Sequence, residues 1–384
     1  MKRPPRLSRK TALVKGTRMR SGWPDGRRDR AARSIGGSAR PCSRAVARAA
    51  LLAALGVQAL AGRAADADVR TTPAPPAASL RAEVGFLTDA TRRLLAGCRV
   101  RADDGTILYT PDGKGNYRAL WTRDFAYMVQ NAGDLMPPAD IEADIRFLLR
   151  GQRNDGAVPD RVRPDGVPVY AAGGEDHPLG EPNLDNPQFL VIAVDAYLKL
   201  LPPTRRRTLF AEWSAQLDRG MESIPRDAHG LVWNDPARPH SPYGFTDCIG
   251  KTGDLLMESL LDWHACQRLA FWHRQARHRD LAREYRRRAW RIEANLDVLW
   301  DETAGAFNAA TRDCRQLDVW GNAFAIDVGF PLGARRVRVL RFLVHDCDQF
   351  VWHGQVRHLL AGQYWQRLLT PVARDRYQNG AYWA

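Results

Sequence analysis

From Leu80 onward, apolar residues recur every three or four positions, and clusters of Gly, Pro or Asn separate the apolar runs. This spacing is typical of amphipathic helices joined by turns. At the start of one predicted helix, Asn186 offers a capping side chain just ahead of Pro187 at the first helical position. Long helices joined by short turns pack as antiparallel pairs, so we expect a series of helical hairpins. The predicted helices lie near residues 81–96, 124–135, 138–152, 187–201, 204–223, 250–277, 279–300, 318–328, 333–346 and 356–369.

The loops between these helices are rich in Gly, aromatic residues and carboxylates. Several of them also alternate in the manner of short strands, which predicts small β-hairpins. Buried polar groups need partners and exposed tryptophans favour aggregation, so a plain helical bundle has no use for such loops. A rim of loops around a pocket, by contrast, would use such polar and aromatic side chains. The segments are NYRALWTRD, DGAVPDRV, GLVWNDP, GAFNAATRD, FVWHGQ and QNGAYW.

The N-terminal region has a different character. A basic segment precedes the apolar run 49–60, which is too short to span a bilayer and has the flanks of a signal peptide. We interpret residues 1–79 as a basic leader, signal peptide and disordered linker, and residues 80–384 as a catalytic domain. The protein is then exported, to the periplasm or the extracellular space. An Arg-rich disordered tail or an organelle transit peptide is the alternative.

Charge and cysteine content exclude several classes of protein. The chain has 57 basic and 43 acidic residues, but residues 1–70 hold 17 basic and four acidic ones, which leaves 40 against 39. The folded part is therefore nearly neutral, which argues against nucleic acid as a partner. No later segment is long enough to span a membrane. Five cysteines follow the leader without CxxC spacing, so we expect at most two disulfides, no metal and no cofactor. Nothing in the sequence indicates the oligomeric state.

Trp121-Thr122-Arg123-Asp124 is the most specific segment. A guanidinium next to a carboxylate offers donors and acceptors to vicinal hydroxyls, and Trp offers an apolar face to a sugar ring. The alternative is that Asp124 caps the helix that follows and Arg123 extends over the surface.

This motif resembles the substrate-clamping WTRD motif of glucoamylases and their relatives in the six-hairpin glycosidase group. The resemblance implies an all-α fold, the (α/α)6 toroid, with Arg123 and Asp124 holding the sugar and carbohydrate as the partner. It covers most of residues 80–384 as an alternation of helices and loops. Some lyases, epimerases and unsaturated-uronide hydrolases share the toroid, so the fold does not decide the reaction.

Inverting hydrolysis needs one carboxyl group to protonate the leaving oxygen and another to activate water. Asp247, in Tyr-Gly-Phe-Thr-Asp, has aromatic neighbours that would raise its pKa, and it stands where the resemblance places the general acid. Asp185 is the second choice. The alternative is that Asp247 caps the long helix that follows. Asp160 and Asn186 are expected to contact substrate.

Aromatic and amide side chains in other loops complete the predicted site. Any one tryptophan is more often core filling than a sugar platform, but as a set they favour carbohydrate. These residues are Trp233, Trp320, Trp352, Gln355 and Trp383. By contrast, Asp254, Glu258 and Asp262 lie at i, i+4 and i+8, which is typical of a solvated acidic helix face.

No residue stands out as the water-activating base. Ten helices are one hairpin short of twelve, and the chain stops after Gln-Asn-Gly-Ala-Tyr-Trp, so we expect that a C-terminal part carrying the base is missing. The sequence therefore predicts a glycosidase that removes a terminal sugar by inversion and is inactive if truncated. A lyase or epimerase on the same toroid and a non-catalytic carbohydrate-binding remnant are the alternatives.

Overall fold

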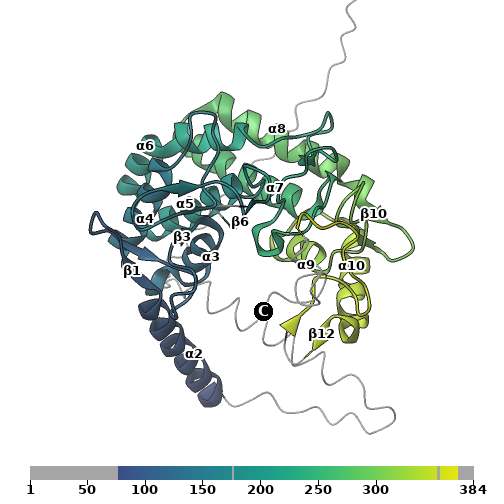
Figure 1. Cartoon of the computed structure of the whole chain (residues 1–384), viewed down its shortest axis with the longest axis horizontal. Coiled ribbons are helices and arrows are strands. Elements are labelled where there is room, and N and C mark those ends of the chain that lie inside the picture. The colour runs from purple at the N-terminus through teal and green to yellow at the C-terminus, as the bar shows by residue number, and fades with distance from the viewer. Residues whose placement is uncertain (1–76, 175–176, 353–354, 371–384) are drawn as a thin grey trace, which may run out of the picture. The chain divides into compact units, whose positions relative to one another are not determined.

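The computed structural model describes residues 77–174, 177–352 and 355–370, which belong to a single unit. The predicted leader and signal peptide, and Trp383, lie outside the described residues. Four helices contact one another in chain order, α3 with α5, α5 with α7 and α7 with α9 (Figure 1). They are α3 (Thr122–Ala132), α5 (Asn186–Leu200), α7 (Leu256–Gln275) and α9 (Val319–Asp327).

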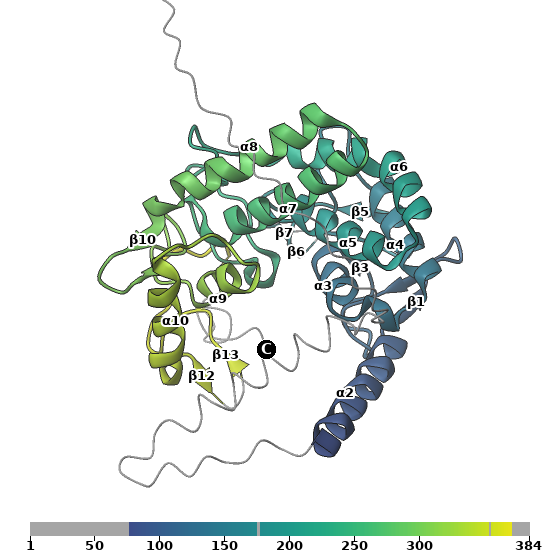
Figure 2. The same cartoon turned by 180° about the vertical axis from the view of Figure 1, so that it is seen from behind.

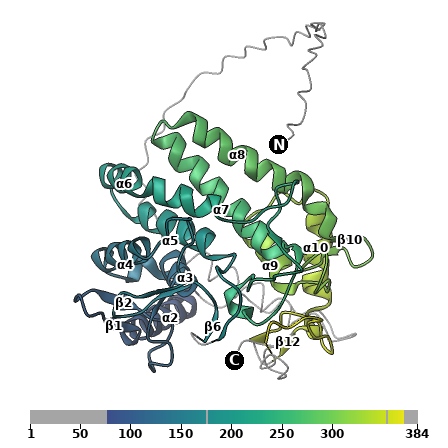
Figure 3. The same cartoon turned by 45° about the horizontal axis from the view of Figure 1, so that its top comes forward.

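Each of these inner helices is followed by an outer one. The outer helices are α4 (Pro138–Arg150), α6 (Pro203–Glu222), α8 (Arg279–Asn295) and α10 (Arg335–His345), and α2 (Ala77–Gly97) precedes them all. The most extensive helix–helix contact joins α7 to α8, which lie side by side (Figure 3). Helix α8 is buried at Ala282, Tyr285, Ala289 and Ile292, the single stripe of a surface helix.

Short antiparallel strands occupy the connecting loops, and β3, β4 and β5 form the one three-stranded sheet among the described residues. The β12–β13 hairpin follows α10 (Figure 2). The strands are β1 (Arg99–Arg101), β2 (Ile107–Tyr109), β3 (Leu120–Trp121), β4 (Arg161–Val162), β5 (Pro168–Val169), β6 (Gly173–Gly174), β7 (His177–Pro178), β8 (Trp233–Asn234), β9 (Gly253–Asp254), β10 (Trp300–Asp301), β11 (Ala306–Phe307), β12 (Val351–Trp352) and β13 (Gln355–Val356). The expected all-α toroid fold with small β-hairpins in its loops is confirmed.

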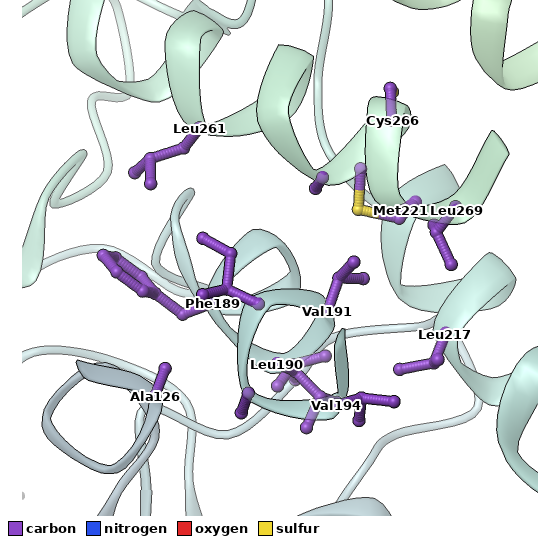
Figure 4. Packing of buried hydrophobic residues seen from close by; sticks show 14 of the residues in the cluster. Ala126, Phe189, Leu190, Val191, Val194, Leu217, Met221, Leu261, Cys266 and Leu269 are labelled. Atoms are coloured by element: carbon purple, nitrogen blue, oxygen red, sulfur yellow. The ribbon is translucent and has the colours of Figure 1, made fainter. Parts of the chain in front are cut away.

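The main core lies where α5 and α7 meet. Phe189 and Leu190 of α5 are buried together with Leu261 and Leu269 of α7 (Figure 4). Each such side chain contributes about 1.5–3 kcal/mol when it leaves water. Because most residues of α5 and α7 are buried, including those of their first turns, packing fixes the starts of both helices and can hold polar groups there in defined positions.

The observed helix ends correct three predictions. Residues 356–369 are not helical; they continue from β13 through turns, and Leu368 bridges Ile249. Helix α7 starts at Leu256 instead of residue 250, so Asp247 does not cap it. Helix α5 starts at Asn186 itself, whose side chain bonds to other segments and caps nothing.

Described cysteines form no disulfide bond with one another. None of the described helices combines the length and the apolarity needed to cross a membrane.

Candidate active site

The pairing of β3 with β4 places two of the predicted loops side by side. Trp121 lies opposite Arg161, and the backbone amide of Thr122 donates to the carbonyl of Asp160 at 3.0 Å. The Thr122 hydroxyl adds a bond of 2.6 Å to the carbonyl of Pro159. Helix α3 therefore begins at a rigid point, with Arg123 and Asp124 in its first turn and Trp121 as its N-cap residue.

Arg123 is a buried hub with 1% of its side chain exposed. One terminal nitrogen donates to Asn186 Oδ1 at 2.7 Å and to Asp185 Oδ1 at 3.3 Å, and the other donates to Asp160 Oδ1. Burial lowers the pKa of Arg123, but the charges of Asp185 and Asp160 outweigh it and the net shift is upward. Both terminal nitrogens are thus occupied by protein groups.

Gly244 covers this guanidinium. A Cβ atom at this position would lie 1.7 Å from Cζ of Arg123, so no larger residue fits without displacing it. The backbone amide of Gly244 also donates to Asp185 Oδ2 at 2.9 Å. The loop that carries Asp247 three residues later is therefore tied to the Arg123 hub.

Asp185 is fully buried, and both of its oxygens accept hydrogen bonds. Burial raises its pKa to about 6, against the opposing charge of Arg123 and the amide of Gly244. Asp160 is equally buried and accepts from Arg123, Arg161 and Asn183. These two carboxylates hold the hub together, and neither faces solvent.

Asp124 and Asp247 are different, because both are partly exposed and no described side chain donates a hydrogen bond to either. Burial raises the pKa of Asp124 to about 6, Asp160 adds to the rise and Arg123 opposes it. Burial also raises the pKa of Asp247, again with Asp160 adding and Arg123 opposing. The same two charges act on both groups because both segments meet Arg123: Asp124 follows it in α3, and Asp247 lies three residues after Gly244, which covers its guanidinium.

The residues of the WTRD motif therefore differ in their burial and in their partners. The sequence predicts that Arg123 and Asp124 clamp the sugar side by side, whereas Arg123 is buried at the centre of the hub and Asp124 is partly exposed. Trp121 is half-buried, with the guanidinium of Arg161 4.6 Å from its ring centroid and the ring of Tyr117 in a T-shaped arrangement at 5.6 Å between centroids. At least one ring face of Trp121 is thus already covered by protein.

Three aromatic residues near the hub were not predicted as site residues. The rings of Tyr127 and Phe245 stack at 5.9 Å, and the hydroxyl of Tyr127 lies 3.4 Å from that of Tyr243. Burial raises the pKa of Tyr127 to about 12. Tyr243 and Phe245 are the aromatic neighbours of Asp247 in the sequence, so that segment could have indicated them. Tyr127 lies one helical turn after Arg123, where the sequence pattern is that of an ordinary core residue.

The remaining predicted residues show no contact with the Arg123 hub in the described structure. Trp233 lies half-buried in β8 opposite Asp254. Trp320 of α9 stacks on His358 at 4.2 Å and donates to the carbonyl of Val356. Gln355 is exposed in β13 opposite Trp352, whose side chain lies outside the description, as does Trp383.

Sugar-cleaving enzymes are among the solved structures that resemble this one. A GH78 family rhamnosidase of a Bacillus species is 14% identical with a TM-score of 0.50, over 67% of this chain and 26% of that chain. A GH63 mannosylglycerate hydrolase from Thermus thermophilus is 15% identical with a TM-score of 0.50, over 77% and 83%. A rhamnosidase from Klebsiella oxytoca with rhamnose bound is 20% identical with a TM-score of 0.49, over 62% and 44%.

The chain has the fold of the six-hairpin glycosidases. It spans less than half the length of either rhamnosidase. No protein-family model matches the sequence, and no curated protein matches it.

A second buried polar cluster lies beside the start of α7 in this six-hairpin fold. Lys251 and Glu258 are both 0% exposed and are joined at 2.9 Å. His358 lies 2.9 Å from Asp318, the N-cap residue of α9, which also accepts from the amide of Gly321. Lys251 Nζ lies 5.7 Å from the ring centroid of Tyr243, the residue before Gly244, so this cluster and the Arg123 hub belong to one region.

The inner helices explain why acidic groups gather there. Asp124, Asp185, Glu258 and Asp318 each lie in the first turn or at the N-cap of α3, α5, α7 and α9. The positive end of a helix dipole stabilises carboxylates at this position. Among the described residues, no three His, Cys, Asp or Glu side chains are arranged to hold a metal ion.

Proposed function

We propose that this protein is a glycoside hydrolase that removes a terminal sugar by inversion. The observation that supports the proposal most directly is a pair of partly exposed carboxyls: Asp124 follows Arg123 in α3, and Asp247 lies in the loop whose Gly244 covers the Arg123 guanidinium. A general acid must be protonated near neutral pH, and burial raises the pKa of Asp247 in that direction. The GH78 family rhamnosidase and the mannosylglycerate hydrolase, which have the same fold, favour a hydrolase over other uses of it.

The proposed roles follow the exposure of each group. Asp247 protonates the leaving oxygen, and Asp124 accepts hydrogen bonds from ring hydroxyls. Inversion also requires a base that takes the proton of the attacking water, and we assign none of the described residues to that role. Arg123, Asp160, Asp185 and Asn186 act as positioning residues, because both terminal nitrogens of Arg123 are bonded to the other three side chains. Export of the protein, expected from its leader, is part of the same proposal.

Exchange of the proposed acid tests the mechanism. Asp247→Asn removes the proton donor at nearly constant volume, and turnover of aryl glycosides should fall at least about a hundredfold. The measurement is release of reducing sugar over a panel of substrates, with NMR recording the anomer formed first. Near-normal turnover in the variant would remove Asp247 from the site.

A matched control and the product chemistry complete this experiment. Asp280→Asn changes an exposed carboxylate on α8, whose side chain is 91% exposed, and should leave turnover unchanged. A lyase would leave an unsaturated product absorbing in the ultraviolet, and an epimerase would release no reducing sugar. Either product would replace the hydrolase assignment.

A further inference from the structure

A cleft of about 620 Å³ lies between the start of α6 and the turn that joins α7 to α8. Its walls include Arg206 and Arg207 of α6, Phe271 of α7 and Arg277 of the turn. A volume of this size is typical of a site for a small molecule. The 20 residues of α7 span about 30 Å, and the Arg123 hub lies near the other end of this helix. The cleft is therefore separate from the proposed sugar site.

The charge of the cleft is one-sided, because three arginines and no acidic residue are found among the described residues that line it. Arg206 donates to the carbonyls of Leu201 and Lys199 at the end of α5. These bonds hold its side chain in place but do not neutralise its charge. The guanidinium groups of Arg207 and Arg277 have no hydrogen-bond or salt-bridge partner within the described part of the chain.

The carboxylates closest to the cleft along the chain are already paired elsewhere. Glu212 follows the lining residue Ala211, but it forms a salt bridge with Arg146 of α4. Asp280 follows the turn and forms a salt bridge with Arg283. Since the chain after residue 70 is nearly neutral, the excess of positive charge belongs to this cleft and not to the whole surface.

Arg277 also has an unusual backbone, which is left-handed with a φ of 65°. Its amide donates to the carbonyl of Arg274 at 3.2 Å, and the amide of His278 donates to the carbonyl of His273 at 2.9 Å. These two bonds form the motif that commonly ends a helix, and glycine is its usual residue at this position because a Cβ atom strains a left-handed backbone. A strained arginine in the wall of a cleft points to a use for its side chain.

The third wall of the cleft is apolar. The ring of Phe271 is exposed, and it packs edge-on against Trp272 at 5.0 Å between centroids. The indole nitrogen of Trp272 donates to Asp195 at 3.0 Å, which fixes this wall. The cleft thus offers an aromatic surface next to unpaired guanidinium groups.

We propose that this cleft binds a small molecule that carries a phosphate or sulfate group, with the anion facing Arg206, Arg207 and Arg277 and an apolar or ring portion against Phe271. A guanidinium group presents paired donors that match the oxygens of phosphate and sulfate. The proposal goes beyond the proposed function, because it concerns the opposite end of α7 and involves no cleavage of a glycoside.

Matched ligands test the need for an anion. Inorganic phosphate, phenyl phosphate and phenyl sulfate are titrated into the full chain at pH 7 and fixed ionic strength, with phenol as the uncharged counterpart and calorimetry measuring Kd. Phenyl phosphate should bind at least about tenfold more tightly than phenol, through charge-assisted hydrogen bonds. It should also bind more tightly than inorganic phosphate, because its ring contacts Phe271.

Variants locate the binding in this cleft. Arg207→Gln and Arg277→Gly should each weaken phenyl phosphate binding at least about tenfold. Arg277→Gly should also raise the Tm of the unliganded protein by about 1–3 °C, because glycine adopts a left-handed backbone without strain. Weaker binding in this variant is then not a result of unfolding. Arg341→Gln changes an exposed arginine of α10 and should leave Kd unchanged.

Several results would overturn the proposal. They are equal binding of phenol and phenyl phosphate, unchanged binding in both cleft variants, and equal weakening by Arg341→Gln. Binding of heparin without binding of either phenyl ester would also contradict it, and would indicate a surface for an acidic polymer instead. Because no measurement depends on glycoside cleavage, failure of the hydrolase assignment and failure of this proposal are distinguishable.

Discussion

Gly244 and Arg123 approach so closely that each constrains the identity of the other. The glycine backbone lies on the guanidinium, which three side chains hold from α5 and from the loop before β4. Core positions at this density resist added volume, and an extra methyl group typically costs about 1–3 kcal/mol. The constraint is steric, because the difficulty lies in the Cβ atom and not in a left-handed backbone.

Gly244→Ala should lower the free energy of unfolding by about 1–3 kcal/mol, measured by urea denaturation. Gly85→Ala is the control, since a Cβ atom there meets nothing within 4 Å. In an Arg123→Ala background the cost at Gly244 should largely disappear, as a double-mutant cycle would report. An equal cost in both backgrounds would show that the contact with Arg123 is not its cause.

Asp124 supplies a prediction on pH. Its pKa in the folded protein is about 6, mainly through burial, above the usual value near 4 in an unfolded chain. The folded state therefore binds more protons between these values, and its stability falls as pH rises from about 4 to 6. Above pH 6 Asp124 is ionised in the folded and the unfolded state, so its unfavourable contribution to the free energy of unfolding no longer changes with pH.

Asp124→Asn removes this destabilising charge. At pH 7 the variant should be more stable than the wild type by about 1–3 kcal/mol, and at pH 4 the two should differ little. Urea unfolding at both pH values measures the difference. Loss of stability at pH 7 would mean that the ionised group has a favourable partner in the folded state.

At the scale of elements, buried pairs join the starts of the inner helices to the loops before them. Lys251 precedes α7 and Glu258 lies in its first turn. The sequence predicts a solvated stripe at Asp254, Glu258 and Asp262, and that prediction is wrong for the last two, which are fully buried. Asp262 pairs with Arg226 at 2.7 Å, so both buried acids have a cation from a neighbouring loop.

Lys251→Met should cost about 3–5 kcal/mol of unfolding free energy, because it leaves Glu258 charged, buried and unpaired. The double variant Lys251→Met with Glu258→Leu should recover most of this loss. Lys199→Met is the control, since Lys199 is 46% exposed in its pair with Asp195 and should cost at most about 1 kcal/mol. A small loss at Lys251 would indicate that water reaches Glu258.

The segment 356–369 shows where helical spacing misleads. Its apolar residues Leu359 and Trp365 are buried, as the pattern requires, but in a small cluster with Ile249 and Cys314. The backbone runs beside residues 248–250, with the amide of Leu369 donating to the carbonyl of Cys248 at 2.7 Å. An irregular segment buries the same apolar positions as a helix would, and local spacing does not distinguish a helix from such a segment.

At the scale of the whole molecule, the alternation of inner and outer helices is what the sequence predicts most reliably. Helix α8 has a clear apolar stripe, and α5 is apolar on nearly every side. Such patterns are local, because a helix face repeats within four residues. The fold of the six-hairpin glycosidases then follows from pairing each helix with the next.

The sequence by itself determined the helices, the hairpins in the loops and the importance of the segment from Trp121 to Asp124. The tertiary structure alone decided which charges are paired and which remain accessible. Arg123 meets partners 37 and 62 residues away, and those contacts bury it while leaving Asp124 beside it open. The physical reason is that the burial of a charge depends on atoms brought together by folding, which no local spacing records.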